Sequence, residues 1–368
     1  MDLIFRTYKE GDASGILKNY FAAFCKSRIC QPSTPEFWEW KYGPTRPNYA
    51  PEGYQICEYK GKIVGTIMST LRTMKFNGEV YKVAGIDDVA TCPLLEKRGI
   101  GKRLMENAIK FMEEQDVDLS ILAADPRGHA KKIYWRIGYK YTTFLSTGAK
   151  ALSIRNAIAN FTPGTPLAIP LRLYGCYKTR RRMKKYKGNL KFEILGKNQD
   201  EFRNKLNENY QSLYSFNEFD QKYWNWYYVE RPKLYKSVVV AAKENGKIIA
   251  GGVITKEPLM GFNTKRWWPL YLLTELFIDK AYRGRGIGSY VLGQLERIAK
   301  QRGVGVMLAH FHGRHEAFRT LVKRMGYIYV NKTGLLMMKP ISARAKKVFK
   351  KIEGKKYVWK VPWEQMGY

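Results

Sequence analysis

The stretch Tyr282-Arg283-Gly284-Arg285-Gly286-Ile287-Gly288 lies between an apolar run, Leu272–Asp279, and a segment whose apolar residues recur at helical spacing. A glycine-rich turn between a strand and a helix exposes backbone N–H groups, and the helix N-terminus adds a partial positive charge, so such a turn binds phosphate. The Gly-Lys-Ser/Thr end of an NTPase loop is absent, as is the order of a dinucleotide fingerprint. The stretch therefore predicts an anion-binding turn of another class.

This turn has a counterpart in the first half of the chain, because the sequence is a duplication. Arg98–Gly101 recurs 187 residues later as Arg285–Gly288, and Phe37–Tyr42 recurs 186 residues later as Tyr223–Tyr228. With 368 residues, about twice the usual domain length, the chain is predicted to hold two copies of one domain. Two further matches at nearly the same offset are Gly61–Gly65 with Gly246–Ala250, and Gly138-Tyr139 with Gly326-Tyr327.

Each copy shows the same order of expected elements, which indicates an α/β (α+β) fold class. A strand, a helix, a tryptophan-rich segment and two β-runs precede the strand that leads into the glycine turn. An amphipathic helix, a buried strand, a short helix and a final strand follow it. The helix after the first turn has its apolar residues at Ile100, Leu104, Met105, Ala108, Phe111 and Met112. The expected division is 1–150 for the first domain, 151–189 for its closing elements and a basic connector, 190–340 for the second domain, and 341–368 for a basic tail.

The chain is strongly basic, since 65 Lys and Arg against 32 Asp and Glu give a formal net charge of +33. Electrostatic steering then favours anionic partners, such as an acidic protein, a nucleic acid or a nucleoprotein, and disfavours small cationic substrates. Solvated lysine-rich faces explain the same charge without a partner. The basic runs Arg180–Lys185 and Lys346–Lys356 are open to both explanations.

The cysteines and the hydropathy bear on the compartment. The five cysteines are scattered and show no CxxC spacing, which predicts reduced thiols in a cytosolic compartment rather than a disulfide framework or a zinc site. The N-terminal residues lack the apolar core of a signal peptide, and no window reaches the roughly 18 apolar residues of a membrane span. We therefore expect a soluble, cytoplasmic protein without a membrane span. The cysteines are Cys25, Cys30, Cys57, Cys92 and Cys176.

Together these motifs resemble the GNAT superfamily of acyl-CoA-dependent N-acyltransferases. Residues 282–288 are similar to the family's R/Q-x-x-G-x-G/A signature, and both copies carry a version of it. The resemblance implies that each copy is a mostly antiparallel twisted sheet flanked by helices. It also implies that the amides of the turn hold the pyrophosphate of acetyl-CoA or another acyl-CoA as co-substrate, while the splayed strand before the turn binds its pantetheine arm. The residues so placed are Leu276, Phe277, Ile278, Arg283, Gly284, Arg285, Gly286, Ile287 and Gly288 in the second copy, and Val89, Ala90, Thr91, Lys97, Arg98, Gly99, Ile100 and Gly101 in the first.

The first copy departs from the signature at one position. Glu96 stands where the second copy has Arg283, although the cations and glycines after it are kept. An acid at this place weakens phosphate binding unless its side chain points away. The second copy is thus the firmer candidate for the acyl-CoA site, and the first remains a candidate for the chemistry.

Amine acylation needs a base for the attacking amine and benefits from an acid for the departing thiolate. Glu275 and Asp88 lie eleven residues before Gly286 and Gly99, at the same place in each copy. Each is a candidate catalytic base, acting directly or through water. Alternatively, such a strand carboxylate only bonds backbone or a tryptophan and serves the structure.

In the family the usual acid is a tyrosine four residues before the Gly of the closing Gly-aromatic pair. Tyr134 holds this place in the first copy, whereas the second copy has Val322, which cannot donate a proton. The string Ile133–Tyr139 is also similar to the enhanced-intracellular-survival acetyltransferases, in which the N-terminal domain of a tandem pair is catalytic. The alternative for Tyr134 is packing on the core face of a short helix. The catalytic signals are therefore divided between the copies.

Histidines and tryptophans form the remaining patterns. His310, His312 and His315 cluster without patterned Cys or carboxylate ligands, so we expect no metal site. The resemblance places His315 where the family often has an Asn near the CoA thiol, which makes it a cofactor-binding candidate. Recurring tryptophan pairs indicate core packing or a cleft wall more than stacking on a base. The pairs that recur are Trp38/Trp40 and Trp224/Trp226; a third pair, Trp267/Trp268, does not recur.

The sequence thus predicts an N-acetyltransferase that moves an acetyl group from acetyl-CoA to an amine, for which an anionic protein or nucleoprotein is a candidate carrier. A direct attack in a ternary complex is expected, because no Cys or Ser lies in a nucleophile motif. Two alternatives stay open. One is a tRNA-dependent aminoacyl transferase of tandem GNAT fold, which suits the basic surface but has no need of an acyl-CoA turn. The other is a nucleic-acid- or protein-binding module that senses acyl-CoA.

Overall fold

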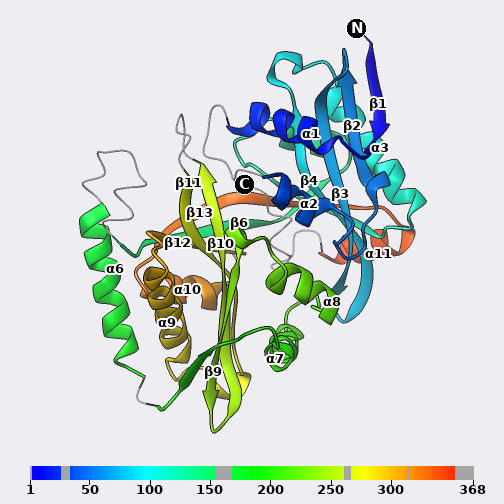
Figure 1. Ribbon diagram of the computed structural model, residues 1–368. Coiled ribbons are helices and arrows are strands. Elements are labelled where there is room, and N and C mark those ends of the chain that lie inside the picture. The colour runs from blue at the N-terminus through cyan, green and yellow to red at the C-terminus, as the bar shows by residue number, and fades with distance from the viewer. Residues whose placement is uncertain are drawn as a thin grey trace.

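A computed structural model describes residues 2–25, 34–153, 168–186, 188–260, 267–312 and 315–352 of the chain. Within them, strands from both halves form one 13-stranded sheet with helices on its faces (Figure 1). The pairs β4–β5 and β11–β12 are parallel and the other described pairs are antiparallel, so the predicted fold class is confirmed. The order along the sheet is β1-β2-β3-β4-β5-β13-β6-β12-β11-β10-β9-β7, and the short β8 pairs with β3.

The two halves contribute equivalent elements in the same order. The first half contains β1 (Leu3–Thr7), α1 (Ala13–Tyr20), α2 (Pro35–Tyr42), β2 (Tyr54–Tyr59), β3 (Lys62–Phe76), β4 (Glu79–Thr91), α3 (Ile100–Glu114), β5 (Leu119–Ala124), α4 (Ala130–Arg136) and β6 (Lys140–Ala151), followed by α6 (Ala168–Met183). The second half contains β7 (Lys191–Ile194), α7 (Asp200–Tyr210), β8 (Ser215–Phe216), α8 (Gln221–Trp224), β9 (Ser237–Glu244), β10 (Lys247–Met260), β11 (Trp267–Ile278), α9 (Ile287–Gln301), β12 (Val306–His312), α10 (Glu316–Arg324) and β13 (Ile328–Pro340), followed by α11 (Ala343–Ile352).

The halves exchange their last strands. β6 pairs with β12 of the second half, β13 pairs with β5 of the first half, and β6 and β13 pair with each other in the middle. Figure 1 shows the orange β13 running from the yellow half toward the blue and cyan half. Equivalent hydrogen bonds hold both crossings: the N–H of Leu152 donates to the carbonyl of Gly305 at 2.7 Å, and the N–H of Ile341 donates to the carbonyl of Asp118 at 2.8 Å. The sheet is therefore shared, rather than closed separately in each half.

The segments after the exchanged strands also pack on the opposite half. Lys150 of β6 forms a buried ion pair with Glu296 of α9 at 2.6 Å, and α6 follows onto the same helix, where Met183 packs over Gly293. At the other crossing, the hydroxyl of Ser342 bonds to a carboxylate oxygen of Asp118 at 2.6 Å. Residues 151–189 were expected to close the first domain. Because β6 has crossed the sheet, α6 instead covers the second half.

Equivalent tryptophans meet where the halves join. Trp40 and Trp226 stack with ring centroids 4.9 Å apart, and each indole N–H donates to the backbone carbonyl of the other at 2.9 Å. Arg46 lies over the Trp226 ring and Arg231 over the Trp40 ring, each at 4.7 Å. These two recurring tryptophan pairs thus serve core packing, while the side chains of the third pair, Trp267/Trp268, lie outside the described residues.

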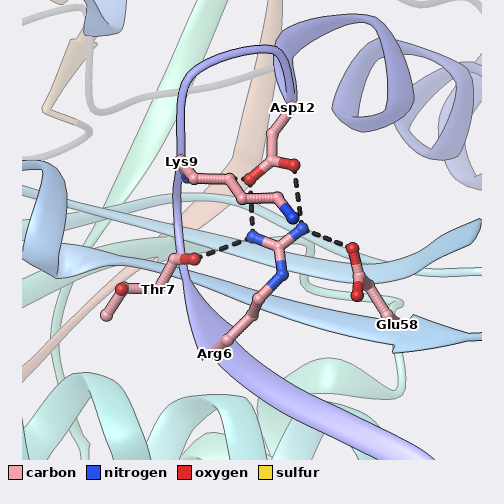
Figure 2. A network of polar contacts seen from close by, with 5 residues as sticks. All are labelled: Arg6, Thr7, Lys9, Asp12 and Glu58. Atoms are coloured by element: carbon pink, nitrogen blue, oxygen red, sulfur yellow. Dashed lines mark hydrogen bonds and ion pairs between the residues drawn. The ribbon is translucent and has the colours of Figure 1, made fainter. Parts of the chain in front are cut away.

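A polar network holds the N-terminal strand in place (Figure 2). The guanidinium of Arg6 donates to both carboxylate oxygens of Asp12, at 2.6 and 2.8 Å, and also bonds to Glu58 of β2. Its hydrogen bond lowers the pKa of Glu58; burial acts to raise the pKa of Asp12, but the bonds from Arg6 and the Lys9 amide lower it overall. In the second half, Glu193 stands at the position of Arg6 and Lys243 at that of Glu58, so the two charges are exchanged. Their ion pair, 2.7 Å between ammonium and carboxylate, is more exposed.

The cysteines and the length of the helices bear on the expected compartment. Cys25 is disulfide-bonded to a partner outside the described residues, so the expectation of reduced thiols is wrong for this residue. Scattered spacing excludes a disulfide framework but leaves room for a single bridge. Cys57, Cys92 and Cys176 are free thiols. Among the helices described, none is long and apolar enough to cross a bilayer.

Candidate functional site

In each half, two parallel strands pair briefly and then diverge before the glycine turn. β4 pairs with β5 over Val83–Ile86, and β11 pairs with β12 over Leu270–Leu273. Beyond these pairs, the ends of β4 and β11 have a ladder partner on one side, β3 or β10, and no described strand on the other. An extended ligand can pair with such free backbone groups. The predicted pantetheine-binding residues, Val89, Ala90 and Thr91 in the first half and Leu276, Phe277 and Ile278 in the second, lie in these diverging ends.

A β-bulge marks the point of divergence in both halves. The register of β4 against β3 shifts beside Asp88, and that of β11 against β10 shifts beside Glu275. Asp88 has a positive φ of 47°. Bulges re-aim side chains and are common next to active sites. Asp88 thus lies within the bulge of β4, whereas Glu275 is paired with Val253 directly beside the bulge of β11.

The two glycine turns have the same backbone shape. Gly99 and Gly286, with φ of 79° and 83°, directly precede α3 and α9. Gly284 also has a positive φ of 82°, and its counterpart Lys97 adopts 63° in spite of its side chain, a conformation that costs on the order of 1–3 kcal/mol. No described atom lies within 4 Å of the Cβ that a substitution would add at any of the three glycines. The space in front of both turns is thus open to an anion.

Charged side chains flank both turns. Arg283 is held against its own strand, donating to the carbonyl of Ile278 at 3.1 Å and to the side chain of Asn209 at 3.2 Å. Glu96 has nearly the same backbone angles as Arg283 and is likewise exposed, but it forms no ion pair among the described residues. Its carboxylate is therefore free to point into water, which leaves the first turn open as well.

Glu275 is enclosed by two tyrosines. Its side chain is 1% exposed, and it accepts hydrogen bonds from the hydroxyl of Tyr228 at 2.7 Å and from that of Tyr210. Burial and the neighbouring carboxylate raise the pKa of both tyrosines far above its ordinary value, so both remain donors. A carboxylate whose oxygens are both held by hydrogen-bond donors is poorly placed to take a proton from a substrate. The arrangement favours the structural alternative for this residue.

Among the residues that the structure describes, Asp88 has one such tyrosine partner. It accepts a hydrogen bond from Tyr42, the counterpart of Tyr228, at 2.6 Å, and its carboxylate lies 3.7 Å from the ammonium of Lys41. Phe24 occupies the sequence position equivalent to Tyr210, so no second tyrosine is supplied. The side chain of Asp88 is 16% exposed. The first half thus keeps a carboxylate that is partly open to solvent.

Asp87 is the site residue that sequence reasoning missed. It is 3% exposed, and neither of its carboxylate oxygens has a hydrogen-bond partner in the described part of the chain. Burial raises the pKa of Asp87 to about 6. The charge of Asp88 also raises this pKa, while the positive charges of Lys41, Arg72 and Arg46 act to lower it. A buried, unbonded carboxylate is costly and is typical of functional sites. The available signal was the pair of adjacent acids where the second half has Thr274 and Glu275.

Tyr134 lies in α4 and packs in the core cluster around α3, with its ring 6.1 Å from that of Tyr139. Its hydroxyl has no hydrogen bond among the described residues, and burial raises its pKa, so it is a protonated donor at neutral pH. Its counterpart Val322 is fully buried. No hydrogen bond joins Tyr134 to Asp88, which instead contacts α2 through Tyr42. The predicted acid thus packs beside α3, and the predicted base contacts α2.

His315 and His310 make contacts within the fold, and the cofactor-binding role of His315 stays a prediction. The ring of His315 accepts the N–H of Phe318 at 3.2 Å and so caps α10. His310 is buried beside the hydroxyl of Thr147 at 2.7 Å, and burial lowers its pKa to about 3, which keeps it neutral. Within the ranges that the structure describes, no three His, Cys, Asp or Glu side chains are arranged to hold a metal ion.

Comparison with known proteins agrees with the duplication. Residues 5–142 match the model of an acetyltransferase (GNAT) domain, and residues 200–327 match that of the acetyltransferase (GNAT) family. A putative phosphinothricin acetyltransferase of Bacillus subtilis is 31% identical over 111 residues, which are 29% of this chain and 61% of that protein. The chain thus matches less than two thirds of the length of that relative.

Solved structures share the fold of the whole chain. Saccharomyces cerevisiae N-myristoyltransferase with bound myristoyl-CoA superposes with a TM-score of 0.69 over 92% of this chain and 84% of that one, at 10% identity. A GCN5-related N-acetyltransferase from Anabaena variabilis gives a TM-score of 0.59 over 94% and 74%, at 12% identity. At these identities the likeness concerns the fold alone.

Proposed function

Each half of this chain is a GNAT domain, and we propose that the pair forms an acyl-CoA-dependent N-acyltransferase that moves an acetyl group from acetyl-CoA to an amine. The observation that carries the proposal is the open glycine turn at the end of a diverging strand. Its amides and the helix N-terminus suit a pyrophosphate, and the unpaired backbone of the strand suits an amide-containing arm. Both matched families are described as acetyltransferases, which makes acetyl the first acyl group to test.

We place the chemistry in the first half. Acetyl-CoA supplies the thioester. Asp87, with Asp88 beside it, takes the proton of the attacking amine, because Asp87 has oxygens without a partner while Glu275 is bonded by two tyrosines. Tyr134 gives its proton to the departing thiolate sulfur, as its unbonded hydroxyl is protonated at neutral pH. The thioester bond breaks as the amide forms, with no covalent bond to the enzyme. The second half then binds acyl-CoA or serves as a scaffold.

The alternatives differ in what they need from the turns. A tRNA-dependent aminoacyl transferase leaves them without a role, and a sensor binds acyl-CoA without turnover. The shared fold with N-myristoyltransferase makes myristoyl-CoA the second donor to test.

The test measures release of free CoA from acetyl-CoA and from myristoyl-CoA with a panel of amines. Amine-dependent release supports the proposal, and binding without release under every condition supports the sensor. Gly99→Glu and Gly286→Glu are a matched pair, since both glycines have a similar φ and open space. We expect Gly99→Glu to abolish turnover and Gly286→Glu to retain it; Gly99→Ala and Gly286→Ala control for backbone strain. The reverse result moves the chemistry to the second half.

A further inference from the structure

Helix α6 exposes an unusual group of apolar side chains. Five of the twelve large apolar side chains that are exposed in the described part of the chain lie on it, among them Leu173 at 62%, Tyr177 at 58% and Tyr174 at 51%. Single exposed apolar residues are normal, but a contiguous group marks an interaction surface. In Figure 1 the helix stands at the outer edge of the second half.

The charge around α6 has one sign. Between Asp125 and Glu193 the sequence has no acidic residue and 16 lysines and arginines. Arg180, Arg181 and Lys184 are exposed, and none of them forms an ion pair among the residues described. Such a segment is complementary to an anionic surface.

Apolar and basic side chains share one stripe of α6. Ile169, Leu173 and Tyr177 follow each other at a spacing of four residues, and Arg180 and Lys184 continue the same line. The stripe is therefore graded along the helix axis: apolar over the first turns and cationic at the end. Its first three members cover about 12 Å, at 1.5 Å per residue.

The opposite side of α6 is fixed to the body of the protein. Thr179 is buried beside Lys150 and Glu296. Gly175 lies against Gly326, since a Cβ added at Gly326 would be 2.9 Å from the Cα of Gly175. The exposed residues 323 and 324, a lysine and an arginine, directly precede this contact at the end of α10 and extend the cationic area. The stripe is thus presented on a rigid support.

We propose that α6 binds the surface of a lipid bilayer that contains anionic lipids. Its apolar first turns enter the boundary between headgroups and acyl chains, with Tyr174 and Tyr177 at the headgroup level, and the cationic end contacts the headgroups. Nucleic acid or an acidic protein matches the charge but leaves the leucines in water. A bilayer surface matches both, because it places anionic groups directly beside an apolar layer. This site is independent of the acyltransferase chemistry.

The experiment is co-sedimentation of the full chain with vesicles of phosphatidylcholine, alone or with about one third phosphatidylglycerol. We expect binding to the anionic vesicles only, and its loss at high salt. Replacing Arg180, Arg181 and Lys184 together by Gln is expected to lower the partition coefficient about 100-fold or more. Leu173→Ser with Tyr177→Ser is expected to weaken binding at constant charge.

Matched controls change exposed residues elsewhere. Lys18, Lys60 and Lys110 replaced together by Gln remove the same charge away from α6, and Ile4→Ser removes an apolar side chain that is 58% exposed. Both should bind like the wild type, and melting temperatures check that all variants are folded. Equal loss in the control and α6 variants overturns the proposal. So does retention by RNA or by an acidic protein without any binding to anionic vesicles.

Discussion

The two halves place the same tyrosine–carboxylate pair at the same bulge, but they differ in what surrounds it. In the second half, Glu275 is bonded by Tyr228 and Tyr210, and the nearby Arg231 is paired with Glu257 at 2.7 Å. Every charge in this group has a partner. A second-half centre of this kind contributes to stability and offers little to a substrate.

In the first half the equivalent positions lack this closure. The counterpart of Glu257 is Arg72, so the first half has an arginine where the second half has an acid, and Asp87 is buried without a hydrogen bond in the described part of the chain. Unsatisfied groups that persist in a folded protein are typical of functional sites. The comparison supports our proposal that, after duplication, the half with the poorer phosphate signature carries the chemistry.

The largest effect is expected from exchanging the carboxylates for amides. Asp87→Asn should lower kcat/KM by about 10²–10⁴-fold, because the base is lost. Glu275→Gln should leave kcat/KM close to that of the wild type. Steady-state kinetics with acetyl-CoA and the best amine measure both. If Glu275→Gln has the larger effect, the two halves have to be interchanged in the mechanism.

Tyr134→Phe should lower kcat by about 10²-fold, at the low end of the range for general acid catalysis. Tyr139→Phe is the control, since the hydroxyl of Tyr139 is already bonded to Ser120 at 2.6 Å and should take no part. A donor with a better leaving group should rescue Tyr134→Phe. An equal loss in both variants contradicts a role for Tyr134 as the acid.

The pH dependence separates the halves in the wild-type protein. Asp87 must be ionised to act as base, so kcat/KM should fall about tenfold per pH unit below the pKa of about 6. Because folding raises this pKa, the folded state binds the proton more tightly, and the contribution to stability falls as pH rises from about 4 to about 6. Unfolding of Asp87→Asn between these pH values should lack that component. A kcat/KM that stays constant through pH 6 argues against Asp87 as the base.

Removing the second tyrosine tests the closed centre. Tyr210→Phe leaves one oxygen of the buried Glu275 with fewer donors and should cost about 1–3 kcal/mol of unfolding free energy, with little change in kcat/KM. Phe24→Tyr, at the equivalent place in the first half, is the converse change and should lower activity. Denaturant titration and kinetics on both variants provide the measurement. Unaltered stability in Tyr210→Phe contradicts the closure of this centre.

The smallest effect is expected at the outer strands. Arg6→Met should cost about 1–2 kcal/mol, since it leaves Asp12 and Glu58 without their shared partner. The pKa values of both acids are lowered in the folded state, so this stabilisation is present at neutral pH and is lost as the pH falls. Lys243→Met, at the exposed pair of the second half, should cause no measurable change. An equal loss of unfolding free energy in Arg6→Met and Lys243→Met contradicts the difference between the two outer strands.

Features set by local sequence were predictable. All six apolar residues expected to face the core in α3 are buried, because the helical period alone determines which side they share. The glycine turns precede α3 and α9 as expected, since a positive φ and a helix start are local properties. The duplication also predicted that the two halves would repeat the same elements.

Features set by distant contacts were not predictable. The closure of Glu275 depends on tyrosines 65 and 47 residues away in sequence. Asp87 was missed because the bulge places two adjacent acids in one polar environment, where a regular strand alternates them between faces. The exchange of β6 and β13 is decided by pairing between residues almost 200 positions apart. The alternation of side chains within one strand does not indicate which other strand it pairs with.

The exchange of the last strands also governs how the chain emerges from the ribosome. β5 ends at Ala124, but the strand that covers its edge begins at Ile328. At about 5–20 residues per second, synthesis of the intervening segment takes roughly 10–40 s. During that time β5 presents an open edge, to which another nascent chain can add. In the sheet described, β5 therefore gains the strand that covers its edge only after β13 of the other half has been made.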